Sequence, residues 1–203
     1  MKKKKYDKLK KECFEYLKQV FAPDERIPVF GEGNLDARIM LVGEAPGEEE
    51  TVQQRPFVGK AGKNLNMFIE TLSLSRDEMY VTNIVKFRPV KKNENTGRLS
   101  NRPPTRQEVN LCMPFLLREI ELVGPGVVVT LGNTALQALS GNVRAAIGQE
   151  HGKPATMRLP SDENVFLFPL YHPASIIYNR SLAQVYKDDL LKLGAFIRER
   201  NLI

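Results

Sequence analysis

Residues 38–47 read RIMLVGEAPG, and this stretch decides the fold class. It joins an apolar run without polar alternation to a tight turn that contains two glycines and a proline. Such runs are typical of strands buried on both faces of a parallel sheet. Three more runs have the same character: MYVTNIV (79–85), VVVTL (127–131) and VFLFPL (165–170). We therefore expect a central sheet of four parallel strands.

Helical patterns alternate with these runs. An opening helix is expected within residues 1–22, because apolar side chains between residues 4 and 21 share one helical face. Further helices are expected at 61–72, 105–123, 133–141 and 181–201, the second of them introduced by the capping pair Thr105 and Glu108. Alternation of strands and helices favours a three-layer α/β/α fold, built as a single domain over residues 1–203.

Composition narrows the class of protein. The chain has 203 residues, a formal net charge of +6 and only two cysteines, Cys13 and Cys112. No apolar run reaches the roughly 18 residues that a membrane span requires, and the basic N-terminus lacks the apolar core of a secretory signal. Two cysteines make no disulfide framework. These features predict a cytoplasmic monomer without a membrane association.

Positive charge is concentrated in residues 86–106. The stretch contains one acid, Glu94, and seven basic residues: Lys86, Arg88, Lys91, Lys92, Arg98, Arg102 and Arg106. A local basic patch is the footprint expected of a protein that binds phosphate backbones. The alternative interpretation is a solvated surface that serves only solubility. We interpret residues 90–104 as an inserted, mobile basic loop that faces DNA.

Polar residues gather where the predicted strands end. Glu44 follows the first strand, Asn83 ends the second and His172 follows the fourth. Each residue alone is more commonly a solvated or backbone-capping group. Ligands of open α/β sheets collect at the carboxyl ends of the strands, however, so three such residues on one rim indicate a site. The acidic residues 48–50 that follow are interpreted as a solvated helix start or loop.

Two other sites fit the sequence poorly. GKAGKN (59–64) resembles part of a phosphate-binding P-loop, but Phe57 and Asn64 stand where that motif needs glycine and Ser or Thr. A nucleotide-phosphate enzyme is therefore a minor alternative. A catalytic metal held by Glu44 and the acids at 48–50 is disfavoured, because consecutive acids cannot all point at one ion. The sequence predicts no metal site.

Five motifs in order resemble the family-4 uracil-DNA glycosylases. They are GEGNLDARIMLVGEAPGEEE, RPFVGKAGKNL, YVTNIVKFRP, LGNTAL and YHPAS, which together extend from Gly31 to Ser175. The resemblance implies a monofunctional glycosylase that flips uracil out of DNA and excises it, leaving an abasic site. Its implied partner is uracil-containing DNA. The alternative is a member of the same superfamily that binds DNA or a deaminated base with little or no turnover.

The resemblance also implies roles for individual residues. Glu44 would lie near the sugar and the attacking water, Asn83 would read the pyrimidine edge, and His172 would bond the uracil O2. Phe57 would stack on the base, and the remaining turn residues would line the substrate site: Gly43, Ala45, Pro46 and Gly47. Residues from Ser175 to Arg180 would press into the DNA. With the basic patch, the expected DNA-binding residues are Lys86, Arg88, Lys91, Lys92, Ser175 and Arg180.

The chain departs from the family in its cysteines. The family's 4Fe–4S cluster uses four, one of them in a K-C-R-P motif that reads Lys86-Phe87-Arg88-Pro89 here. Cys112 retains a later ligand position, and Cys13 is the only cysteine upstream. Because such a cluster needs four ligands, the sequence predicts that this chain holds none.

Overall fold

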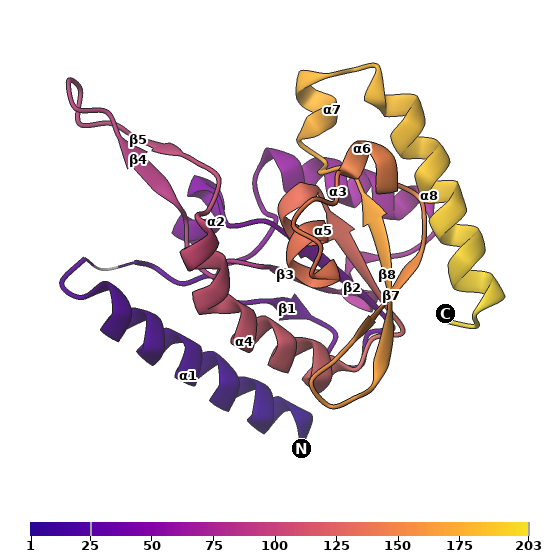
Figure 1. Ribbon diagram of the computed structural model, residues 1–203, viewed down its shortest axis with the longest axis horizontal. Helices are drawn as coiled ribbons and strands as arrows, with labels where there is room; N and C mark the ends of the chain where they lie inside the picture. Colours follow the sequence, from indigo (N-terminus) through magenta and orange to yellow (C-terminus); the bar gives the residue numbers. More distant parts are fainter. Residues whose placement is uncertain (25, 203) are drawn as a thin grey trace.

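The protein is an α/β structure with a mixed, six-stranded sheet (Figure 1). The computed structural model describes residues 1–24 and 26–202. The strands are β1 (Glu32–Gly33), β2 (Ile39–Gly43), β3 (Tyr80–Asn83), β4 (Val90–Lys92), β5 (Leu99–Asn101), β6 (Val127–Leu131), β7 (Ala155–Arg158) and β8 (Asn164–Leu170). The helices are α1 (Lys2–Phe21), α2 (Glu48–Gln53), α3 (Lys60–Thr71), η1 (Arg76–Glu78), α4 (Arg106–Val123), α5 (Asn133–Ser140), α6 (Ile147–Glu150), α7 (Ser175–Tyr178) and α8 (Leu182–Glu199).

The sheet has the strand order β1-β3-β2-β6-β8-β7. The four apolar runs correspond to β2, β3, β6 and β8, which pair with one another in parallel. Two antiparallel edge strands extend this set, β1 beside β3 and β7 beside β8. The sheet therefore has two strands more than the four that the sequence predicted. The edge strands escaped the sequence pattern because β1 has two residues and β7 is largely exposed.

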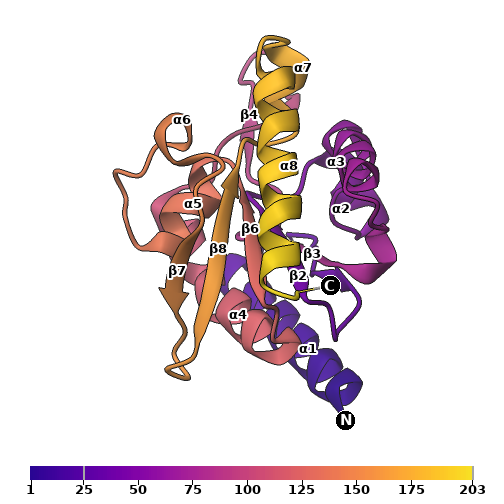
Figure 2. The same cartoon turned by 90° about the vertical axis from the view of Figure 1, so that its right-hand side faces the viewer.

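Helices cover both faces of the sheet (Figures 1 and 2). On one face, α1 and α4 pack together over a core that includes Leu17 and Leu116. On the other face, α3 and α8 pack over a core that includes Leu65 and Leu193. Thr105 and Glu108 form the predicted capping box at the start of α4. None of the helices among the described residues combines the length and hydropathy needed to cross a bilayer.

Residues 90–104 contain a β-hairpin instead of the expected loop. Strands β4 and β5 pair antiparallel, with Val90 opposite Asn101 and Lys92 opposite Leu99. The hairpin projects away from the body of the protein near α2 (Figure 1). All residues from 91 to 101 are exposed, so the hairpin has no core of its own.

Candidate functional site

The sheet brings Gly43 and Asn83 side by side at the carboxyl ends of β2 and β3. The pairing continues past the strands, because the amides of Ile84 and Val85 donate to the carbonyls of Gly43 and Glu44 at 2.9 and 3.0 Å. A Cβ atom at Gly43 would overlap the Phe57 ring and the Asn83 amide oxygen. Glycine is therefore required at this point, because the ring and the amide must approach the backbone closely.

A cavity of about 760 Å³ opens at this edge of the sheet. Five of the predicted site residues line it: Ala45, Gly47, Phe57, Asn83 and His172. The last three come from three different loops or strand ends. Phe57 and Asn83 are 5% and 3% exposed, so each is almost enclosed by protein. The Phe57 and His172 rings lie 6.1 Å apart at an angle of 30°. An aromatic ring, an amide and an imidazole therefore line the same cavity.

Glu44 lines an adjoining, smaller cavity of about 350 Å³, which shares Ala45 and His172 with the larger one. Its carboxylate accepts a hydrogen bond of 2.5 Å from the Thr134 hydroxyl. Thr134 lies in the first turn of α5, whose positive end favours a nearby anion. Sequence reasoning missed Thr134, because 90 positions separate it from Glu44 and no spacing pattern links them.

His172 is held as a hydrogen-bond acceptor at one ring nitrogen. Its Nδ1 accepts from the Ala174 amide at 3.2 Å. Burial lowers the pKa of His172 from 6.5 to about 4, and the opposing influence of Glu50 is smaller. The ring is therefore neutral near pH 7, and its proton resides on Nε2. Gly132 packs closely against the His172 Cβ, and the Asn64 amide donates to the Pro173 carbonyl at 3.2 Å, which fixes the loop.

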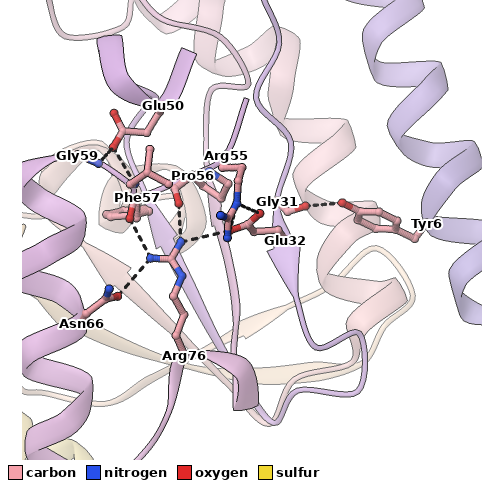
Figure 3. Close-up of polar contacts among 11 residues, drawn as sticks. Tyr6, Gly31, Glu32, Glu50, Arg55, Pro56, Phe57, Gly59, Asn66 and Arg76 are labelled. Atoms are coloured by element: carbon pink, nitrogen blue, oxygen red, sulfur yellow. Dashed lines mark hydrogen bonds and ion pairs between the residues drawn. The ribbon is translucent and has the colours of Figure 1, made fainter. Parts of the chain in front are cut away.

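The loop that carries Phe57 is braced by two charged side chains (Figure 3). Phe57 has a left-handed backbone with φ of 54°, a conformation that costs a non-glycine residue roughly 1–2 kcal/mol. Arg76 donates to the carbonyls of Pro56 and Phe57 at 2.5 and 2.8 Å. From the other side, Glu50 accepts from the amides of Val58 and Gly59 at 3.1 and 2.8 Å.

Glu50 also accepts from the Gly47 amide at 3.0 Å, so it ties the turn after β2 to the Phe57 loop. The interpretation of residues 48–50 as a purely solvated run is therefore wrong for Glu50. Glu50 stands three residues after the cap of α2, but Gly47 has no side chain to complete a capping box, so the sequence lacked the full signature. Arg76 gave no such signal, since its partners lie 19 and 20 positions away.

The predicted DNA-binding residues differ in their exposure. The prediction for Lys86 is wrong: its side chain is 0% exposed and forms an ion pair with buried Glu119. It also donates to Thr82 and to the Asn83 carbonyl, so it supports the site from within.

Arg88 is half-buried at the foot of the hairpin, bonded to Asn101 and Glu48. The exposed members are Lys91, Lys92 and Arg180, while Ser175 lines the smaller cavity.

The two cysteines lie in the core between α1 and α4. The Cys112 sulfur accepts a hydrogen bond of 3.4 Å from the Lys86 backbone amide. Phe87, which stands where the family motif has a cysteine, is 0% exposed, and its ring lies 4.6 Å from that of Phe21. Two thiols and a buried aromatic ring do not fit a cluster that needs four ligands. Among residues 1–24 and 26–202, no group of three or more His, Cys, Asp or Glu could hold a metal ion.

Comparison with known proteins gives consistent matches. A model of the uracil DNA glycosylase superfamily matches residues 30–193. The chain is 39% identical over 167 residues to the type-4 uracil-DNA glycosylase of Saccharolobus solfataricus, covering 80% of this chain and 73% of that protein. It is 38% identical over 173 residues to the type-4 enzyme of Thermotoga maritima, covering 84% and 83% respectively.

We predict that His172 titrates near pH 4. The measurement is the pH dependence of its ring ¹⁵N chemical shifts by NMR, with the signals assigned by their loss in His172→Gln. Because the folded pKa lies below the unfolded value of 6.5, the unfolded chain binds the extra proton first as pH falls. The contribution to stability is present above pH 6.5 and is lost as pH falls towards 4, by roughly 3 kcal/mol in total. A midpoint near 6.5, or protonation at Nδ1, would contradict this assignment.

Proposed function

The chain belongs to the type-4 uracil-DNA glycosylases of the uracil DNA glycosylase superfamily, and we propose that it hydrolytically removes uracil from DNA and leaves an abasic site. One observation carries the proposal to these residues: Phe57, Asn83 and His172 line one cavity, and Glu44 lines the cavity that adjoins it. A base within a duplex cannot reach such a cavity, so the nucleotide must be flipped out of the stack.

The proposed binding mode replaces what the flipped base loses. Stacking on an aromatic side chain contributes about 1–3 kcal/mol per base, and the Phe57 ring supplies that face. The planar amide of Asn83 offers a donor and an acceptor to the Watson–Crick edge of uracil. Because Asn83 is almost fully buried, a base that leaves its amide unpaired would be disfavoured by the cost of a buried unsatisfied group.

The proposed chemistry divides charge between the two cavities. As the bond between C1′ and N1 breaks, the sugar gains positive charge and uracil leaves as an anion. Neutral His172 donates its Nε2 proton in a hydrogen bond to the uracil O2, and the Glu44 carboxylate stabilises the sugar or orients the attacking water. The water oxygen bonds to C1′, and the proton that it releases balances the one gained by uracil. Thr134 orients the Glu44 carboxylate through its hydroxyl.

Excision is tested with a labelled uracil-containing oligonucleotide that is treated with alkali after incubation. Wild-type protein is expected to give cleavage at uracil only. Glu44→Ala and Asn83→Ala are expected to slow the single-turnover rate by about 100-fold or more, because each removes a group that acts on the reacting nucleotide. Glu163→Ala, which removes an exposed acid of the β7–β8 turn, is the matched control. Binding without cleavage under all conditions would instead indicate a binding protein.

The hairpin is proposed to contact the phosphates beside the flipped nucleotide. Residues paired across two strands share a face, and the faces alternate along each strand. Asn101 lines the larger cavity and pairs with Val90, so Lys92 and its partner Leu99 lie on that same face. Lys91 pairs with Ser100 on the opposite face. This placement favours Lys92 over Lys91 as the phosphate contact.

Charge reversal separates the two lysines. Lys92→Glu is expected to weaken DNA binding several-fold and to lower the slope of log K against log salt by about 1, because one phosphate contact is lost. Lys91→Glu makes the same change of net charge on the other face and is expected to change the slope less. Affinities measured by fluorescence anisotropy over a salt series decide between them. Equal slopes for the two variants would reject the assignment of faces.

We further propose that this chain carries no 4Fe–4S cluster. The support is chemical: the whole sequence has two cysteines, and Phe87 occupies a ligand position of the family motif. Packing replaces the cluster at that place, since Phe87 contacts Phe21 and the Arg26 guanidinium lies 5.5 Å from its ring. Iron analysis of protein purified without oxygen is expected to find no stoichiometric iron. Absorbance near 400 nm with about four irons per chain would refute this.

A further inference from the structure

The Phe57 loop depends on a residue that lies outside both cavities. Arg76 belongs to the short helix η1, between α3 and β3, and is not among the cavity-lining residues. Its Nη1 contacts the Phe57 carbonyl at 2.8 Å and the Asn66 amide oxygen at 3.2 Å. Its Nη2 contacts the Pro56 carbonyl at 2.5 Å and pairs with Glu32 at 3.5 Å. The planar guanidinium thus meets two consecutive carbonyls at once (Figure 3).

These contacts hold the backbone at the position where it has an unfavourable conformation and little free space. Phe57 is left-handed, and Gly62 packs so closely that a Cβ there would overlap the Phe57 carbonyl. The carbonyl is therefore enclosed between α3 and the guanidinium. The ring orientation follows from this backbone, because the ring packs so closely on Gly43 that a Cβ atom there would overlap it. Lysine could not replace the arginine, since an ammonium lacks the fork that bonds two acceptors in one plane.

We infer that Arg76 is a positioning residue for base stacking, which acts through the Phe57 backbone and does not touch the nucleotide. The inference rests on the proposed function for its effect on uracil, but the geometry itself can be tested without any activity. Glu50 holds the next two amides of the loop from the opposite side. Loss of Arg76 should therefore loosen those amides as well as misplace the ring.

The first arm of the test is a double-mutant cycle of Arg76→Met and Phe57→Ala, with single-turnover excision as the readout. In wild-type background, Arg76→Met is expected to slow excision by about tenfold, whereas in Phe57→Ala background the same change should cost less than about twofold. Equal losses in the two backgrounds would overturn the inference, because they would show that Arg76 affects excision independently of the Phe57 ring.

The matched control is Arg55→Met. Arg55 pairs with the same Glu32 at 2.9 Å, but its guanidinium donates to this carboxylate and not to the carbonyls of Pro56 and Phe57 (Figure 3). This variant is expected to excise uracil within about twofold of wild type, since it removes a surface ion pair only. A tenfold loss in Arg55→Met would assign the effect to the Glu32 pair and overturn the role of Arg76.

The second arm measures hydrogen exchange of the Val58 and Gly59 amides, which needs no activity. Exchange is expected to rise about tenfold in Arg76→Met and to stay unchanged in Arg55→Met. Arg76→Lys, which keeps the charge beside Glu32, is expected to resemble Arg76→Met and takes its place if the latter does not fold. Unchanged exchange in the Arg76 variants overturns the inference. A wild-type protein without excision would reject the proposed function and leave the exchange result to decide the positioning role.

Discussion

One loop, residues 56–59, sets the geometry of the site, and two opposite charges hold it. Arg76 binds two of its carbonyls and Glu50 binds two of its amides, with all four bonds between 2.5 and 3.1 Å. Hydrogen bonds to charged groups contribute about 1.5–3 kcal/mol each, which exceeds the roughly 1–2 kcal/mol cost of a left-handed Phe57. The hydrogen bonds therefore outweigh the cost of the left-handed Phe57 backbone. The Glu50 carboxylate also accepts from the Gly47 amide, which fixes the turn that carries Glu44.

Charged side chains elsewhere in the protein differ between the exposed hairpin and the surroundings of the cavities. The exposed positive residues of the hairpin project away from the body of the protein, where long-range attraction to a phosphate backbone is effective. Several charged groups near the cavities are bonded within the protein: Glu44 to Thr134, Glu50 to backbone amides and Lys86 to Glu119. In the proposed mechanism a basic protein can keep the Glu44 carboxylate for the electron-poor sugar, because the proposed phosphate contacts lie on the hairpin.

The region in which the family motif has a cysteine is tightly packed by side chains of this chain. Cys13 and Cys112 are both fully enclosed, and Phe87 joins Phe21 in the same part of the core. Lys86, the residue before Phe87, turns inward to Glu119 on α4 and at the same time supports the Asn83 carbonyl. The N-terminal helix, α4 and the end of β3 are therefore connected by side chains of the chain itself.

By itself the sequence determined the α/β class, the four buried strands, the capping box of α4 and the set of residues at the strand ends, because these depend on local pattern and on recognisable motifs. Only the tertiary structure decided the two edge strands, the burial of Lys86, the role of Glu50 on the Phe57 loop and the contact of Thr134 with Glu44. These features depend on partners far away in the chain. Charge and spacing along a sequence cannot tell whether a lysine faces phosphate or a buried carboxylate, since that depends on which helix packs beside it.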